Sequence, residues 1–134
     1  MIEFDKLTKK YESGFEALSN ISFHMDAGEM AFLTGRSGAG KSTLLKLLML
    51  MERPSSGSLL INGTNLNHLR KAQVPTYRRQ LGVVFQNHRL LVDRSLYDNV
   101  SLPLQVSGYP RPEMSRRVRA ALDSVGLLER EHLR

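Results

Sequence analysis

The stretch that decides the fold is Gly35-Arg36-Ser37-Gly38-Ala39-Gly40-Lys41-Ser42-Thr43. It matches the phosphate-binding loop pattern G-x-x-x-x-G-K-[ST], with Gly35, Gly40, Lys41 and Ser42 at the fixed positions. Glycines let the main chain curl so that successive N–H groups point into one concavity, which binds anions. Lys41 can reach the β- and γ-phosphates of a nucleotide as a point charge, and the Ser42 hydroxyl can ligate Mg²⁺. The loop therefore predicts a site for a nucleoside triphosphate.

The sequence on both sides of the loop fits this motif. Residues 29–34 have the composition of a buried strand, and residues 41–51 are predicted to form a helix. The leucines and methionines of that helix make it apolar almost all round, which predicts a helix buried inside a domain. A strand, a loop and a helix in this order disfavour the alternative, an accidental Gly- and Ser-rich turn.

Composition excludes several classes of protein. The chain has 134 residues, no cysteine and four scattered histidines, so it predicts one domain without disulfides or a cysteine-ligated metal. The apolar runs are too short to cross a bilayer, and the N-terminus lacks a signal pattern, so we expect a cytoplasmic protein. The net charge of +6 permits nucleic-acid binding. No alternation of basic and aromatic residues supports it, so a nucleotide site and arginine-rich helix faces are the preferred explanation.

Two strand-like runs precede the loop. Residues 1–11 begin with apolar side chains near strand alternation, and residues 18–25 form a second such run, which together predict a small antiparallel sheet. Tyr11 lies on the turn between them. Its ring could stack on a nucleotide base or pack at the sheet edge, and the sequence leaves both roles open.

A second apolar segment, at residues 81–85, is predicted to be a buried strand that ends at Gln86. Ligands of open α/β sheets bind at the carboxyl ends of strands, where the Gln86 amide could reach Mg²⁺ or an attacking water. A surface glutamine at a strand end is the common alternative. Residues 87–89 are predicted to form a polar loop.

The rest of the chain is predicted to be helical. Ser95 is a plausible N-cap, Pro103 is expected to break or kink the run that follows, and Pro112 can open a further helix that stops at Gly126. The predicted fold is α/β, a phosphate-loop NTPase core with parallel strands, an N-terminal antiparallel β subdomain and a helical part. We expect the nucleotide-binding core at 1–86 and the helical part at 87–134.

Taken together, these motifs resemble the N-terminal part of an ABC-type ATPase domain. The resemblance implies that the phosphate-loop NTPase core is incomplete and that residues 87–134 are only the start of an α-helical subdomain. The resemblance rests on Tyr11, residues 35–43, 53–57, 62–63 and 83–86. Within that family, residues 52–54, 74–75, 78–91 and 93–95 resemble the FtsE-type ATPases of bacterial cell division.

The resemblance implies roles for individual residues. Tyr11 would stack on adenine, and Ser42 and Gln86 would approach Mg²⁺. Lys41 would contact the β- and γ-phosphates of ATP. The loop residues that would surround the phosphates are Gly35, Ser37, Gly38, Ala39, Gly40, Lys41, Ser42 and Thr43. The implied partners are an FtsX-like transmembrane protein and, in the full-length protein, a second copy at the inner face of the plasma membrane; no nucleic acid is expected.

The chain also departs from the family. Its 134 residues contain neither the Leu-Ser-Gly-Gly-Gln signature loop nor the apolar strand ending in Asp-Glu, and no histidine has the context of the family's switch histidine. We therefore expect a truncated chain to which Lys41 and Gln86 contribute but in which no catalytic set is complete, so that it does not hydrolyse ATP alone. Three alternatives remain: a lipoprotein- or macrolide-exporter ATPase subunit, a non-enzymatic docking module for a membrane protein, and a chromosome-maintenance or DNA-repair ATPase.

Overall fold

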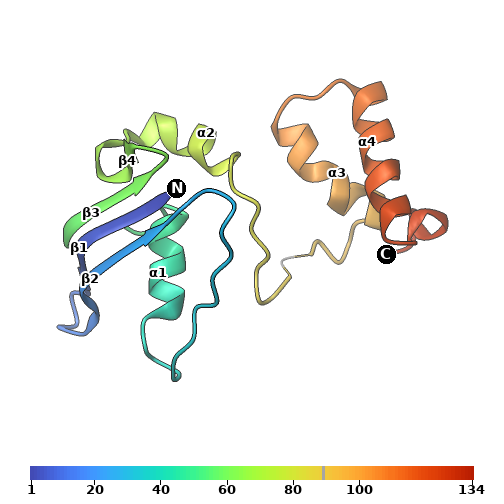
Figure 1. Ribbon diagram of the computed structural model, residues 1–134. Helices are drawn as coiled ribbons and strands as arrows, with labels where there is room; N and C mark the ends of the chain where they lie inside the picture. Colours follow the sequence, from blue (N-terminus) through green and yellow to red (C-terminus); the bar gives the residue numbers. More distant parts are fainter. Residues whose placement is uncertain (89) are drawn as a thin grey trace. The chain divides into compact units, whose positions relative to one another are not determined.

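The computed structural model describes residues 1–88 and 90–134 and divides into two compact units, Met1–Leu81 and Gly82–Arg134 (Figure 1). The predicted polar loop at 87–89 includes Arg89, which lies outside the described residues. The expected division after Gln86 into a nucleotide-binding core and a helical part stays a prediction, because compactness alone assigns no function to either unit.

The first unit is built on one four-stranded sheet. Its strands are β1 (Ile2–Lys10), β2 (Glu16–Met25), β3 (Ser56–Ile61) and β4 (Thr64–Asn65). They pair in the order β2-β1-β3-β4, and every pairing is antiparallel. Asn62 and Gly63 connect β3 to β4 with φ angles of 47° and 78°, the two left-handed residues that a tight hairpin turn requires. The predicted N-terminal antiparallel sheet is therefore confirmed.

An irregularity in β1 explains how this strand contributes two core residues at an unusual spacing. Phe4 and Leu7 are both buried, although residues three apart in a regular strand point to opposite faces. The register shifts between them against β2, and Lys6 has a left-handed φ of 47°. Such a bulge resets the alternation of side chains, so both residues reach the same core.

One side of the sheet is covered by α1 (Lys41–Leu48), the helix that follows the phosphate loop (Figure 1). Leu47 of this helix lies in a single apolar core, whose buried residues are Phe4, Leu7, Leu18, Leu47, Leu50, Leu59, Leu66 and Tyr77. The helix ends at Leu48, three residues before the predicted end at Met51. The prediction that it is buried all round is wrong, because the sheet covers only one face and leaves Leu45 50% exposed.

The C-terminal end of α1 is held by α2 (Val74–Arg78). The Tyr77 hydroxyl donates to the Leu48 carbonyl oxygen at 2.5 Å. The Arg78 guanidinium donates to the carbonyl oxygens of Met49 and Leu50, each at 2.8 Å. These side chains satisfy carbonyls that have no partner within the helix, which is why the helix can stop beside a buried core.

Two predictions about strands are wrong. Residues 29–34 and 81–85 lie outside every strand of the described chain, and its sheet contains no parallel pair. A strand exists only when its backbone groups pair with a neighbouring strand, and neither segment has one. Their side chains are accordingly exposed, 82% for Phe32 and 93% for Val84. The α/β class with an antiparallel N-terminal sheet holds, but residues 1–88 and 90–134 contain no parallel core.

The second unit is helical, as predicted. It contains α3 (Leu96–Val106) and α4 (Arg111–Ser124), whose most deeply buried residues are Ser101, Val118 and Leu122. Ser95 caps α3, since its hydroxyl accepts from the Asp98 N–H at 3.1 Å. The helix continues through Pro103, and Gly126 follows α4 with a left-handed φ of 71°.

Shorter elements complete the described chain. Three 3-10 helices occupy Leu66–His68, Lys71–Gln73 and Leu128–Arg130. No helix in residues 1–88 and 90–134 combines the length and the apolar character that a bilayer span requires.

Candidate functional site

The phosphate loop forms a tight curl that ends at the start of a helix. Gly38 and Gly40 have left-handed φ angles of 81° and 85°, a conformation that glycine adopts without strain. The Ala39 N–H donates back to the Arg36 carbonyl oxygen at 3.1 Å, which closes a turn within the loop. Helix α1 begins at Lys41, as the motif predicts.

The first turn of α1 carries backbone N–H groups that no side chain caps. Gly40 occupies the N-cap position, and no side chain caps the helix there. The first hydrogen bond of the helix runs from the Leu44 N–H to the Gly40 carbonyl oxygen at 2.9 Å. The N–H groups of the first turn have no partner within the helix, and the helix dipole adds positive potential at the same place. A phosphate fits this combination of donors and potential.

The Lys41 side chain folds back over the loop. Its Nζ donates to the carbonyl oxygens of Gly35 and Arg36, at 2.6 and 2.8 Å. These bonds keep the ammonium beside the curl instead of extending it into solvent. Ser42 follows on the exposed side of the helix, where its hydroxyl is accessible. The predicted phosphate ligands therefore lie on one short stretch of chain.

Contacts with the sheet hold the loop from one side. The Thr43 hydroxyl lies 3.2 Å from the Tyr11 hydroxyl, and Thr43 is buried. Gly40 lies against β2: a Cβ at this position would be 2.8 Å from Leu18 Cδ2 and closer still to the Ala17 carbonyl oxygen. Only glycine permits this approach, so the second fixed glycine of the motif also joins the loop to the sheet.

A charged cluster beside Tyr11 was not predicted from the sequence. The Glu52 carboxylate lies 3.4 Å from Lys9 Nζ and 3.4 Å from Lys46 Nζ. Burial raises the pKa of Glu52, but the neighbouring Tyr11, Lys46 and Lys9 side chains lower this pKa by more, so the net shift is downward. Glu52 therefore stays ionised at neutral pH and pairs with both lysines, of which Lys9 lies over the Tyr11 ring. Residues so far apart in the sequence carry no local pattern that would reveal this cluster.

Gln86 belongs to the second unit. It lies exposed in the turn of residues 86–88, directly after the segment 81–85, which has no regular secondary structure. The structure brings Tyr11 together with the phosphate loop, since both belong to the first unit. The shared Mg²⁺ role of Ser42 and Gln86 stays a prediction.

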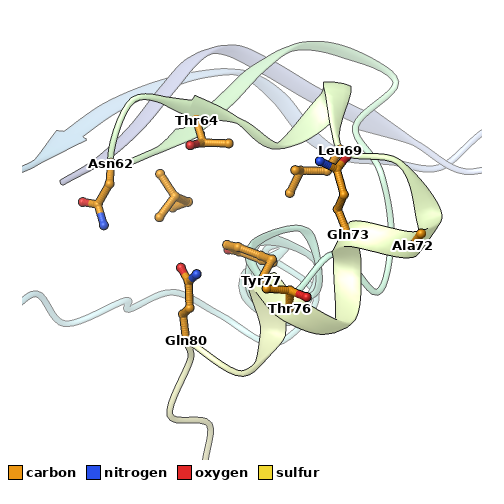
Figure 2. A pocket seen from close by; sticks show the side chains of 9 residues that line it. Asn62, Thr64, Leu69, Ala72, Gln73, Thr76, Tyr77 and Gln80 are labelled. Carbon is orange, nitrogen blue, oxygen red and sulfur yellow. The ribbon is translucent and has the colours of Figure 1, made fainter.

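A separate hollow of about 330 Å³ lies between the β3–β4 hairpin and α2. Figure 2 shows Asn62, Tyr77 and Gln80 around it, and its lining contains no lysine or arginine. The Asn62 side-chain oxygen also accepts from the N-terminal amino group at 2.8 Å. This hollow offers little to a polyphosphate, so the loop remains the candidate site.

Comparison with known proteins adds an independent finding. The protein-family model described as "ABC transporter" matches residues 18–134. The chain is 52% identical over 130 residues to the cell division ATP-binding protein FtsE of Escherichia coli strain K12, a match that covers 97% of this chain and 59% of that protein. The FtsE protein of Haemophilus influenzae is 44% identical over 133 residues, covering 98% of this chain and 61% of that protein.

A solved structure shows the same similarity in three dimensions. A dimeric ATP-binding cassette in a post-hydrolysis state, bound to ADP and Pi, aligns with a TM-score of 0.86 at 29% identity. The alignment covers 98% of this chain and 60% of that one. The chain thus spans about 59% of the length of the first curated relatives that it matches.

Proposed function

Because this chain belongs to the ABC transporter family, we propose that it is the nucleotide-binding part of an FtsE-like ATP-binding protein that acts in bacterial cell division. The observation that carries the proposal is the loop at residues 35–43, a glycine curl with Lys41 folded over it at the start of a helix. The 52% identity to an FtsE protein supports the assignment to cell division.

The proposed ligand is ATP with Mg²⁺. Residues 37–43 would surround the phosphates, and Lys41 would exchange its bonds to loop carbonyls for the β- and γ-phosphates. The Ser42 hydroxyl and the Gln86 amide would ligate Mg²⁺, which neutralises phosphate charge when bound. Tyr11 would lie under the adenine. The open N–H groups and the accessible Ser42 hydroxyl are the features of this structure that fit such a ligand.

The proposed setting is the inner face of the plasma membrane. We propose that the full-length protein pairs with a second copy of itself and docks on an FtsX-like transmembrane protein. The name of the FtsE relatives supports the cell-division role, and the dimeric state of the similar solved cassette supports pairing.

We further propose that these 134 residues alone do not hydrolyse ATP. Phosphoryl transfer depends on positioning the nucleophile and on neutralising charge, and the family's Asp-Glu pair and signature loop are not in this sequence. Purified chain should release no phosphate from ATP above the buffer rate. Phosphate release that disappears in Lys41→Ala would contradict this part of the proposal.

Binding is tested by thermal unfolding with and without Mg-ATP. A ligand at ten times its Kd stabilises the folded state by about 1.4 kcal/mol, which raises the melting temperature. The rise should be lost in Lys41→Ala and kept in the matched variant Lys46→Ala, whose lysine lies on the same helix but faces Glu52. An equal rise in wild type and Lys41→Ala would show that the loop is not the binding site.

A further inference from the structure

A basic hollow lies beside the C-terminal end of α1. It has a volume of about 320 Å³, and its lining includes three cations, Arg53, Lys71 and Arg78. All three belong to the first unit, so the hollow is formed within one compact body. The phosphate loop precedes α1 and the hollow follows it, and the eight residues of the helix separate the two by about 12 Å. The basic hollow is therefore a separate place from the candidate nucleotide site.

The main chain holds the two arginines of the basic hollow in place. The Arg53 guanidinium donates to the carbonyl oxygens of Leu66, Asn67 and Leu69, at 3.2, 2.9 and 2.6 Å. The Arg78 guanidinium is held by its two bonds at the end of α1. A guanidinium has five N–H donors, so both arginines keep donors for a further acceptor. Because these side chains are already ordered, an incoming anion does not have to order them.

The third cation, Lys71, is exposed and uncommitted. Within the described residues its ammonium has neither a hydrogen bond nor an ion pair. Glu52, the one carboxylate that the described lining contains, lies 3.4 Å from Lys9 Nζ and 3.4 Å from Lys46 Nζ, so its charge is already balanced. The sequence has no further Asp or Glu before Asp93. The positive charge of the basic hollow is therefore left without a counter-charge from the chain.

We propose that the basic hollow is a second anion site, which takes one phosphate group between Lys71 and the two fixed guanidiniums. The planar fork of a guanidinium matches the oxygens of a phosphate, and the ammonium adds a point charge. The phosphate can belong to a dissolved compound or to the headgroup of an anionic phospholipid, since both present the same oxygens. The site does not rest on the proposed function, because it uses no residue of the phosphate loop.

The first test titrates the ¹⁵N-labelled chain with inorganic phosphate at constant ionic strength. The backbone N–H signals of residues 50–53, 71 and 78 should shift to saturation, both in wild type and in Lys41→Ala, whose phosphate loop lacks its lysine. Lys71→Ala should bind phosphate about fivefold more weakly, the size of effect that an exposed ion pair carries. Lys71 has no partner in the fold, so this substitution removes no contact that holds the hollow together.

The matched control is Lys10→Ala. Lys10 is also an exposed lysine of the first unit, but it lies on β1 and outside the basic hollow. The variant removes the same charge from the chain and should bind phosphate as wild type does. Shifts confined to residues 35–43, or equal phosphate affinity in wild type and Lys71→Ala, would overturn the second anion site.

The second test separates the two sources of the phosphate group. Sedimentation with phosphatidylglycerol vesicles should recover wild type and Lys10→Ala equally, and Lys71→Ala about fivefold less, if the group belongs to a lipid. If the group belongs to a dissolved compound, the vesicles should not distinguish Lys71→Ala from Lys10→Ala, whereas inorganic phosphate still should. A chain in which neither probe distinguishes these two variants would contradict the proposal.

Discussion

The strongest prediction concerns Gly40, where the phosphate loop and the sheet touch. A methyl group added in Gly40→Ala would meet two obstacles at once. The residue has a left-handed φ of 85°, and the added Cβ would press on the Ala17 carbonyl oxygen and lie 2.8 Å from Leu18 Cδ2. The backbone of β2 cannot rotate away as a flexible side chain would, so the loop must move off the sheet.

Substitutions at two other glycines separate the cost of the left-handed backbone from the cost of the steric clash. Gly38 has nearly the same φ, 81°, but open space where a Cβ would lie. Gly57, on β3, has a φ of 79°, and its Cβ would lie 2.6 Å from the Asp5 carbonyl oxygen, in the sheet and away from the loop. Gly38→Ala therefore has the conformational penalty alone, whereas Gly57→Ala has both penalties at a position outside the site.

The expected magnitudes follow from these differences. An alanine in left-handed backbone costs about 1–2 kcal/mol, which is the expected loss of unfolding free energy in Gly38→Ala. Forcing a methyl group against packed backbone adds about 1–3 kcal/mol. Gly40→Ala and Gly57→Ala should therefore each lose roughly 2–5 kcal/mol, a large share of the stability of a small domain.

The assay combines stability with binding. Urea unfolding followed by far-ultraviolet circular dichroism gives the loss of stability, and calorimetric titration with Mg-ATP on the folded protein gives the affinity. Gly57→Ala should bind ATP as wild type does once it is folded, whereas Gly40→Ala should bind at least about tenfold more weakly because its loop is displaced, a loss of about 1.4 kcal/mol. If Gly40→Ala is no less stable than Gly38→Ala, the close approach of Ala17 to the loop is refuted.

Two further predictions concern the supports around the core. Tyr77→Phe removes the hydroxyl that donates to Leu48, and we expect a loss of about 1 kcal/mol at neutral pH by urea unfolding. Burial raises the pKa of Tyr77, so Tyr77 ionises first in the unfolded chain, above roughly pH 10, and its contribution to stability is lost as pH rises through the folded pKa. The stabilities of wild type and Tyr77→Phe should therefore converge at high pH. A difference that stays constant with pH would argue against the buried hydroxyl. In the second unit, hydrogen bonds from Arg119 at 3.1 and 3.0 Å lower the pKa of Glu131. This stabilisation is present above the unfolded pKa of roughly 4.3 and is lost as pH falls through the folded pKa. Melting curves of Arg119→Gln should therefore show lower stability than wild type at neutral pH and a smaller loss of stability in acid. An equal loss of stability in acid would count against the ion pair.

Features that depend on neighbouring residues could be predicted from the sequence. The helix start at Lys41, the turn at Asn62 and Gly63 and the cap at Ser95 all follow from side-chain chemistry within a few residues. The same holds for the curl of residues 35–43, because the motif fixes it within one short stretch. The roles of these residues as phosphate ligands stay a prediction.

Features that depend on distant residues could not be predicted. The two lysines that surround Glu52 come from β1 and α1, and nothing in the sequence links them. The turn between β1 and β2 is an intermediate case. The sequence points to Tyr11, but only the folded turn brings Phe15 into parallel contact with it.

Residues 29–34 show how the two kinds of information combine at the site. Their apolar pattern predicts a strand that leads into the phosphate loop, yet a strand forms only with a partner, and here Phe32 is left 82% exposed. The loop keeps its curl all the same, because Thr43 contacts Tyr11 and Gly40 rests on Ala17. The geometry of the loop therefore depends on β1, β2 and the turn between them, which is why substitutions at Gly40 should disturb nucleotide binding more than substitutions in the segment that precedes the loop.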